Sequence, residues 1–295
     1  MLRKTSLCLA LLVSTQLLNA QSKVKVSEFS VSTGSFMQES PISQFADWQR
    51  MAPGSSLLPT LSKDLNSFDQ MNSEINGGNV WSANLGLQFT DRAGMRYNRN
   101  PLLRLGIQYQ GASVLSQSFH KQTIYAHDTL TSSQTGEQTY VDSIQVEHYD
   151  INYRQKRLML DASLIFRTKS QSRWGLYAGI GMSLGASFRN QTELNYSMYK
   201  GTSGIVPMHD MVFHNMFGNN NDNRHEHFAN KASFAGALYI PLGATFRLSN
   251  KHEFWNKISL TFETRPGLYW SGIPELTTTT LNTGVATQVG FRVNW

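Results

Sequence analysis

The end of the chain, GVATQVGFRVNW at residues 284–295, carries the pattern that decides the fold. One set of alternate positions is mostly large and apolar: Val285, Thr287, Val289, Phe291, Val293 and Trp295. The positions between them are small or polar: Gly284, Ala286, Gln288, Gly290, Arg292 and Asn294. Because successive side chains point to opposite faces of a strand, this period of two predicts a β-strand with one apolar face.

The same alternation recurs in seven earlier segments, so the sequence predicts eight strands. These segments are 25–34, 80–89, 102–109, 157–167, 173–189, 231–248 and 257–270. The phase of the alternation shifts near Ser27 and again between Tyr153 and Leu158. Each shift predicts a β-bulge, the second one near Arg154 to Lys156.

Two features favour a membrane barrel over a soluble sandwich, which would also alternate. The non-apolar face of the strands is small and rich in glycine, as a crowded barrel interior requires. The connections alternate between long (37–78, 120–145, 200–229) and short (91–100, 168–173, 249–253), as they do in outer-membrane barrels. The fold class is therefore predicted to be all-β: an eight-stranded antiparallel transmembrane β-barrel with long extracellular loops.

The N-terminus has the layout of a secretory signal peptide. Basic Arg3 and Lys4 precede an apolar run that is shorter than the roughly 20 residues of a membrane-spanning helix, and Ala20 ends the segment. We expect residues 1–20 to be removed and residues 21–295 to form the barrel domain. Removal lowers the formal charge from +6 by two, to +4, which is too weak a basic balance to predict nucleic-acid binding.

With this pattern the chain resembles the small eight-stranded outer-membrane barrels of Gram-negative bacteria, of the OmpA/OmpX-like, porin-family type. The resemblance rests on the strand pattern and on the C-terminal set Val289, Phe291, Val293 and Trp295. In such proteins this ending is similar to the signal that the barrel-assembly machinery reads. The resemblance implies an outer-membrane location and contact with membrane lipids and lipopolysaccharide. It implies no single activity, because one fold hosts many functions.

Charged residues on the predicted inward faces are candidates for a network in the lumen. They are Arg104, Asp161, Lys257, Glu263, Arg265 and Arg292. Buried charges need partners, so we expect them to form salt bridges that plug the barrel. The alternative is an ion or proton path through the same residues.

The first long loop is expected to hold two short amphipathic helices. Residues 40–52 place Phe45, Trp48 and Ala52 on one helical face, and residues 62–75 predict a second helix with Ser62 as its N-cap. Residues 117–130 and 139–153 are expected to project beyond the membrane as a sheet, and we expect both helices to pack on it. Binding to lipid headgroups, capping of the mouth and docking of a partner remain alternatives.

The loop 200–229 contains four histidines, which are His209, His214, His225 and His227. Imidazole binds zinc, copper and nickel, but the spacing matches no fixed metal motif, so the main expectation is a polar surface loop without a metal or cofactor. No nucleophile with a nearby base can be identified from spacing, which indicates that the chain is not an enzyme.

These patterns predict a surface anchor, an interaction protein or a structural protein of the envelope. We expect a monomer that meets any extracellular protein partner through residues 37–78 and 200–229. The alternatives are a small porin or an ion- or proton-conducting channel, and a lipid-modifying enzyme or a component of a secretion system.

Overall fold

The structure is a computed structural model, and it describes residues 24–39, 44–72, 75–89, 101–168, 173–203 and 222–295. The expected signal peptide, His209 and His214 lie outside these residues.

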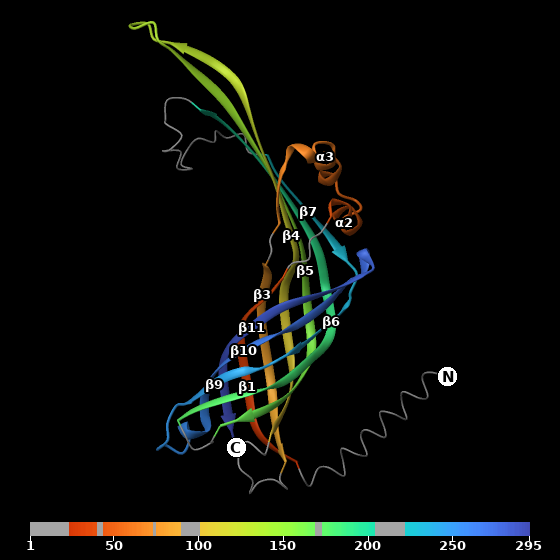
Figure 1. Ribbon diagram of the computed structural model, residues 1–295, viewed down its shortest axis with the longest axis vertical. Coiled ribbons are helices and arrows are strands. Elements are labelled where there is room, and N and C mark those ends of the chain that lie inside the picture. Colours follow the sequence, from red (N-terminus) through yellow and green to blue (C-terminus); the bar gives the residue numbers. More distant parts are fainter. Residues whose placement is uncertain (1–23, 40–43, 73–74, 90–100, 169–172, 204–221) are drawn as a thin grey trace, which may run out of the picture.

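The strands form one antiparallel sheet that closes on itself (Figure 1). Its members are β1 (Val24–Glu39), β3 (Ile75–Phe89), β4 (Leu102–Thr131), β5 (Gln138–Arg167), β6 (Trp174–Ser203), β8 (Phe234–Tyr239), β9 (Leu242–Arg247), β10 (Ile258–Ile273) and β11 (Thr278–Asn294). Strand β11 pairs with both β10 and β1, which closes the ring. Strands β8 and β9 share one place between β6 and β10, so the barrel has eight positions, as predicted.

The shared place results from a proline in the predicted strand 231–248. Pro241 has no N–H to donate, and regular pairing stops at Ile240 and Pro241. The Ile240 N–H still donates to the Pro266 carbonyl at 2.9 Å, and the Gly179 N–H donates to the Pro241 carbonyl at 3.0 Å. The ring therefore stays connected across the interruption.

Both predicted bulges are present. The register between β1 and β3 shifts between Val26 and Glu28, and that between β5 and β6 shifts between Arg154 and Lys156. Opposite the second bulge, Arg189 adopts a positive φ of 53°. At this level β6 changes partner, from β8 at residues 181–186 to β7 (Asp222–Asn230) at residues 190–198. The bulge thus marks where the sheet leaves the barrel.

Beyond the bulge the long strands continue as a projecting sheet (Figure 1). Strands β4, β5 and β6 have 30 residues each, about three times the 9–11 that cross a membrane. As predicted, residues 117–130 and 139–153 belong to this sheet, because β4 and β5 stay paired up to Thr131 and Gln138. Strand β2 (Asp69–Asn72) pairs with β4 and β7 pairs with β6, so the prediction that 200–229 is loop throughout was wrong for β7.

The first of the two predicted helices in the loop is α2 (Phe45–Met51). The second is α3 (Leu57–Lys63), so the predicted helix at 62–75 was wrong. Its N-terminus is set by Ser55, whose hydroxyl accepts the N–H groups of Leu57 and Leu58, both at 3.1 Å. The residues after α3 form the 3-10 helix η1 (Leu65–Ser67) and then β2, because pairing with β4 satisfies their backbone groups.

Two further 3-10 helices complete the described elements: η5 (Trp255–Lys257) and η6 (Pro274–Leu276). Within the described residues, every helix is too short or too polar to cross a bilayer.

The outward faces of the barrel strands carry a belt of exposed apolar side chains. Leu160 is 71% exposed, Leu176 is 63% exposed and Phe291 is 60% exposed, whereas the residues between them point inward. A belt of this kind is far larger than the apolar patches of soluble proteins. Since the closed ring also pairs its backbone groups internally, the barrel has the two properties that a membrane-spanning sheet needs.

Candidate functional site

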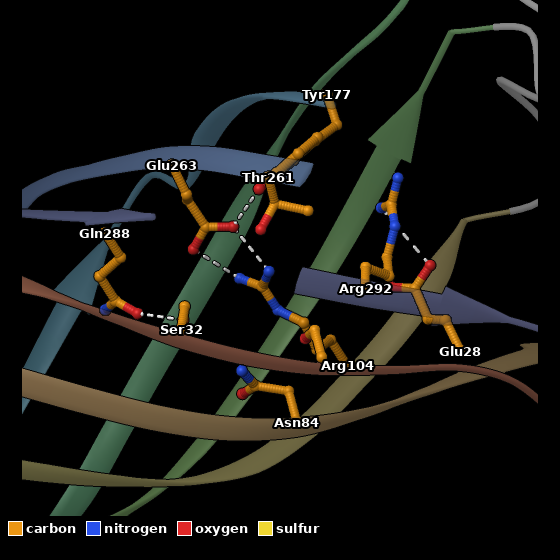
Figure 2. A pocket seen from close by; sticks show the side chains of 10 residues that line it. Glu28, Ser32, Asn84, Arg104, Tyr177, Thr261, Glu263, Gln288 and Arg292 are labelled. Atoms are coloured by element: carbon orange, nitrogen blue, oxygen red, sulfur yellow. Dashed lines mark hydrogen bonds and ion pairs between the residues drawn. The ribbon is translucent and has the colours of Figure 1, made fainter. Parts of the chain in front are cut away.

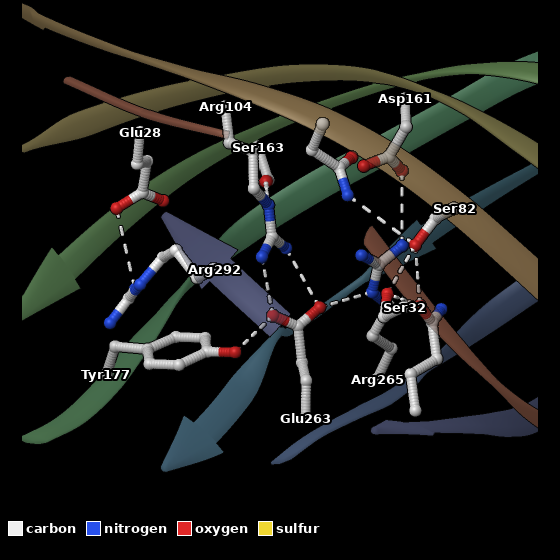
Figure 3. A network of polar contacts seen from close by, with 12 residues as sticks. Glu28, Ser32, Ser82, Arg104, Asp161, Ser163, Tyr177, Glu263, Arg265 and Arg292 are labelled. Atoms are coloured by element: carbon white, nitrogen blue, oxygen red, sulfur yellow. Dashed lines mark hydrogen bonds and ion pairs between the residues drawn. The ribbon is translucent and has the colours of Figure 1, made fainter. Parts of the chain in front are cut away.

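A cluster of four charged residues crosses the middle of the lumen (Figure 3). We call Arg104, Asp161, Glu263 and Arg265 the lumen charge cluster. Arg104, on β4, donates two hydrogen bonds to the Glu263 carboxylate on β10, at 2.6 and 2.8 Å. The Tyr177 hydroxyl donates to the same carboxylate at 2.6 Å. This bidentate pairing is the strong form of an arginine–carboxylate contact.

Arg265 extends the cluster to the next carboxylate. Its Nε donates to Glu263, and its Nη1 lies 3.5 Å from Asp161 Oδ1. The Tyr239 hydroxyl donates to Asp161 at 2.5 Å, and its ring lies 4.9 Å from the Arg265 guanidinium carbon. All four charged residues are at least 93% buried, so each depends on the others for compensation.

A second group of ions, the rim ion group, lies nearer the end of the barrel that holds the C-terminus. Arg167 donates to Glu28 at 2.6 Å, and Arg292 lies 3.5 Å from the same carboxylate. Arg292 was predicted to join the lumen network, but among the described residues its ion-pair partner is Glu28 and not a member of the lumen charge cluster. The predicted network left out both Glu28 and Arg167: Glu28 follows the β1 bulge, and Arg167 has the inward phase of its strand but lies at the strand end.

Lys257 is a correction to the predicted network. It is exposed and lies in η5, immediately before β10 begins at Ile258. The prediction extended the strand phase one residue too far, into a turn where the side chain can reach solvent. Ser259 takes the first buried inward position of β10 instead.

A polar cavity of about 20 Å³ lies between the two groups (Figure 2). Its lining is Glu28, Ser30, Ser32, Asn84, Arg104, Tyr177, Thr261, Glu263, Gln288 and Arg292. Asn84 Oδ1, Gln288 Nε2 and Arg292 Nε have no hydrogen-bond partner among the described residues. A space of this size accommodates a water molecule, and these atoms offer it polar contacts.

A further polar layer lies above the lumen charge cluster, toward the projecting sheet. Arg157 is 1% exposed, and its Nε donates to Gln155 at 3.0 Å. Gln155 in turn donates to the Tyr153 hydroxyl at 3.1 Å and to the Gly272 carbonyl at 3.0 Å. The predicted network left out Arg157, although Arg157 lies four residues before Asp161 on β5 and so points to the same inward face. The layer links β5 to β10 across the upper lumen.

The helices α2 and α3 form a separate apolar core with the projecting sheet. This outer core contains Trp48, Met51, Ala52, Leu57, Leu58, Leu61, Val114, Leu115, Phe119, Tyr149, Ile151, Tyr153, Leu194, Ile273 and Leu276. Trp48 is fully buried, and its indole N–H donates to Gln117 on β4. Burial in this core raises the pKa of the Tyr149 hydroxyl well above its ordinary value. The expectation that the helices pack on the projecting sheet is confirmed.

Glu226 on β7 holds the start of α3 in place. Its carboxylate accepts hydrogen bonds from the Ser55 hydroxyl at 2.5 Å and from the Ser56 N–H at 3.0 Å. Partial burial acts to raise the pKa of Glu226, but the hydrogen bonds from the two serines outweigh it and lower the pKa below its ordinary value. Asn230 adds a hydrogen bond to the Met51 carbonyl at 2.8 Å.

The opposite face of the projecting sheet is polar, because side chains that alternate with the outer core point away from the helices. His225 and His227 lie there with their rings 6.0 Å apart, and His225 Nδ1 lies 2.6 Å from Asn195 Oδ1. His148 Nε2 lies 3.0 Å from Asp150 Oδ2, and the Ser118 hydroxyl donates to Asp150 Oδ1 at 2.6 Å.

Ser118, Asp150 and His148 do not form a nucleophile and base. The carboxylate stands between the hydroxyl and the imidazole, so Ser118 donates to Asp150 and not to His148. Activation of a serine needs the imidazole next to the hydroxyl. The arrangement therefore suits the binding of a cation better than acyl transfer.

No family model matches the chain, and no curated protein matches it. Among solved structures, Neisserial surface protein A (NspA) is 12% identical with a TM-score of 0.34, covering 92% of this chain and 99% of its own. Ail, the attachment invasion locus protein of Yersinia pestis, is 11% identical with a TM-score of 0.26, covering 91% of this chain and 99% of its own. The assignment of the fold rests on the closed strand pairing.

Proposed function

We propose that the chain is an outer-membrane barrel whose lumen is plugged and whose activity resides in the projecting sheet, as a surface anchor or interaction protein. In this proposal residues 1–20 are the signal peptide, residues 21–295 form the barrel domain, and Val289, Phe291, Val293 and Trp295 are the signal for the barrel-assembly machinery. Membrane lipids and lipopolysaccharide surround the apolar belt.

The observation that carries the proposal is how β4, β5 and β6 are divided. Each has 30 residues, of which about 9–11 are needed to cross a membrane, and the remainder builds a sheet with its own helix-packed core. In contrast, the lumen is crossed at separate levels by the rim ion group, the lumen charge cluster and the Arg157 layer. In the lumen charge cluster two arginines and two carboxylates neutralise one another, and such pairing in a filled interior supports a structural plug.

The test is a variant in which residues 122–146 are replaced by a short turn next to the Lys121–Glu147 pair, so that β4 and β5 end lower while the outer core and the barrel are kept. Cells that produce the full chain or this variant are compared for adhesion to immobilised matrix proteins and for resistance to detergent. The proposal expects adhesion to fall and detergent resistance to stay unchanged. Unchanged adhesion with lower detergent resistance would instead support a purely structural role in the envelope.

The polar cavity favours a second candidate, a small ion or proton channel, because it brings unpaired polar atoms next to the lumen charge cluster. Planar lipid bilayer recordings on the purified full chain separate the two functions. A plugged barrel gives no stable single-channel steps, whereas regular steps at neutral pH would support the channel.

A further inference from the structure

Two histidines face each other on the polar side of the projecting sheet. His120 on β4 and His148 on β5 are direct partners in the strand register, and their ring centroids are 6.2 Å apart with an interplanar angle of 62°. Both side chains are partly exposed, so solutes reach them from outside. Residues directly opposite on antiparallel strands have Cβ atoms about 4.5–5.5 Å apart, which is close enough for two imidazoles to bind one ion.

Asp150 completes a triangle with this pair. It follows His148 by two residues, so it lies on the same face of the same strand. Its Oδ2 lies 3.0 Å from His148 Nε2. In a tetrahedral zinc site with bonds of about 2.0–2.1 Å, two ligand atoms are about 3.3 Å apart. The His148 nitrogen and the Asp150 oxygen therefore already have nearly the separation of two ligands of one zinc ion.

We propose that His120, His148 and Asp150 form a binding site for a divalent transition metal, with zinc or copper as the ligand class. Imidazole nitrogen and carboxylate oxygen are donors that these ions favour. The Ser118 hydroxyl, 2.6 Å from Asp150 Oδ1, holds the carboxylate in orientation, in the way that outer groups orient metal ligands. A water molecule, or Asp69 of the neighbouring β2, takes the fourth position.

The described residues contain no three His, Cys, Asp or Glu side chains that already converge as an assembled centre. Binding therefore includes a rotation of the partly exposed His120 side chain toward the ion. Lys121 does not compete for this place, because its ammonium lies 5.3 Å from the Phe68 ring on the other face of the sheet. His148 and Asp150 are therefore already in position, and His120 completes the site after a rotation of its side chain.

The experiment uses the untagged full chain, refolded in detergent and stripped of metal with EDTA. ZnCl₂, and separately CuCl₂, is titrated by calorimetry into the wild type and into His120→Ala, His148→Ala and Asp150→Asn. The matched control is the double variant His225→Ala and His227→Ala, which removes the other histidine pair of the same face. A heat-modifiability gel confirms that each variant keeps the closed barrel.

The proposal expects one metal ion per chain that depends on the three ligands. Loss of any one of them should weaken binding about 10-fold or more, and the control should bind like the wild type. X-ray absorption of the zinc complex should show two imidazole ligands. Wild-type binding no tighter than millimolar, or full binding by His120→Ala or His148→Ala, would overturn the site.

Discussion

Neutralising Glu263 tests the lumen charge cluster most directly. In Glu263→Gln, the side chain keeps its size but loses the charge that accepts from Arg104 at 2.6 and 2.8 Å and from Tyr177 at 2.6 Å. Arg104 is 7% exposed and Arg265 is 2% exposed. Their two guanidinium groups would then share one remaining acid, Asp161, which lies 3.5 Å from Arg265. Removing one partner of a buried pair costs about 3–5 kcal/mol, because the other charge stays buried without compensation.

The assay is reversible unfolding by guanidinium chloride in lipid vesicles, followed by tryptophan fluorescence. We expect Glu263→Gln to lower the free energy of unfolding by about 3–5 kcal/mol and to lower the temperature at which the heat-modifiable band disappears. Glu253→Gln is the matched control, since Glu253 is exposed in the turn before β10 and should tolerate the change.

A double variant distinguishes loss of the pair from loss of packing. Arg104→Met in the Glu263→Gln background removes one of the two buried cations left without a carboxylate partner. The loss of unfolding free energy in the double variant should therefore be smaller than the sum of the losses in the two single variants. A loss below about 1 kcal/mol in Glu263→Gln would refute the reasoning, because the cluster would then behave like a solvated surface pair.

Three further predictions concern other parts of the chain. Trp48→Ala should lower the stability of the outer core by about 3–5 kcal/mol, since the indole is fully buried. Limited proteolysis should then cut the variant between residues 44 and 72, while its barrel still shows a heat-modifiable band on a gel. Loss of that band would contradict the existence of two separate cores. The lowered pKa of Glu226 means that its stabilisation of the α3 start is present above the unfolded-state pKa and is lost as pH falls through the folded-state pKa. The protection of the α3 amides from hydrogen exchange, taken relative to their intrinsic exchange rates at each pH, should therefore fall at acidic pH in the wild type but not in Glu226→Gln. Deleting Trp295 should slow membrane insertion more than it lowers the stability of the folded barrel, and a normal membrane yield would argue against an assembly signal there.

The parts of the fold that the sequence predicted are those that follow from the two-residue period. A period of two is a local property of each strand and does not depend on which strand lies beside it. The barrel strands and the bulge near Arg154 could therefore be predicted from the sequence alone. The start of α3 could not, because it depends on the Ser55 cap and on the pairing of β2 with β4. Local pattern in residues 62–75 favoured a helix, and tertiary pairing overrode it.

The candidate sites show the same division. The inward phase identified Arg104, Asp161, Glu263 and Arg265 but could not say which would touch. The pair of Glu28 and Arg167 joins residues 139 positions apart, and the closed ring brings them together. His120 and His148 likewise meet only through the β4–β5 register, which two bulges shift. Contacts of this kind depend on register, and a one-residue slip would remove all of them.

The bulge near Arg154 separates two structures with different requirements. Below it, each strand has two ladder neighbours and an apolar outer face, so stability comes from closure and from paired charges in the lumen. Above it, β6 leaves β8 for β7, and two helices supply an apolar core that no longer depends on the membrane. Because the buried apolar residues of the outer core form a cluster separate from those in the barrel, changes on the polar face of the projecting sheet should leave the barrel intact. The surface role proposed above depends on this independence, and the geometry of β4 to β7 provides it.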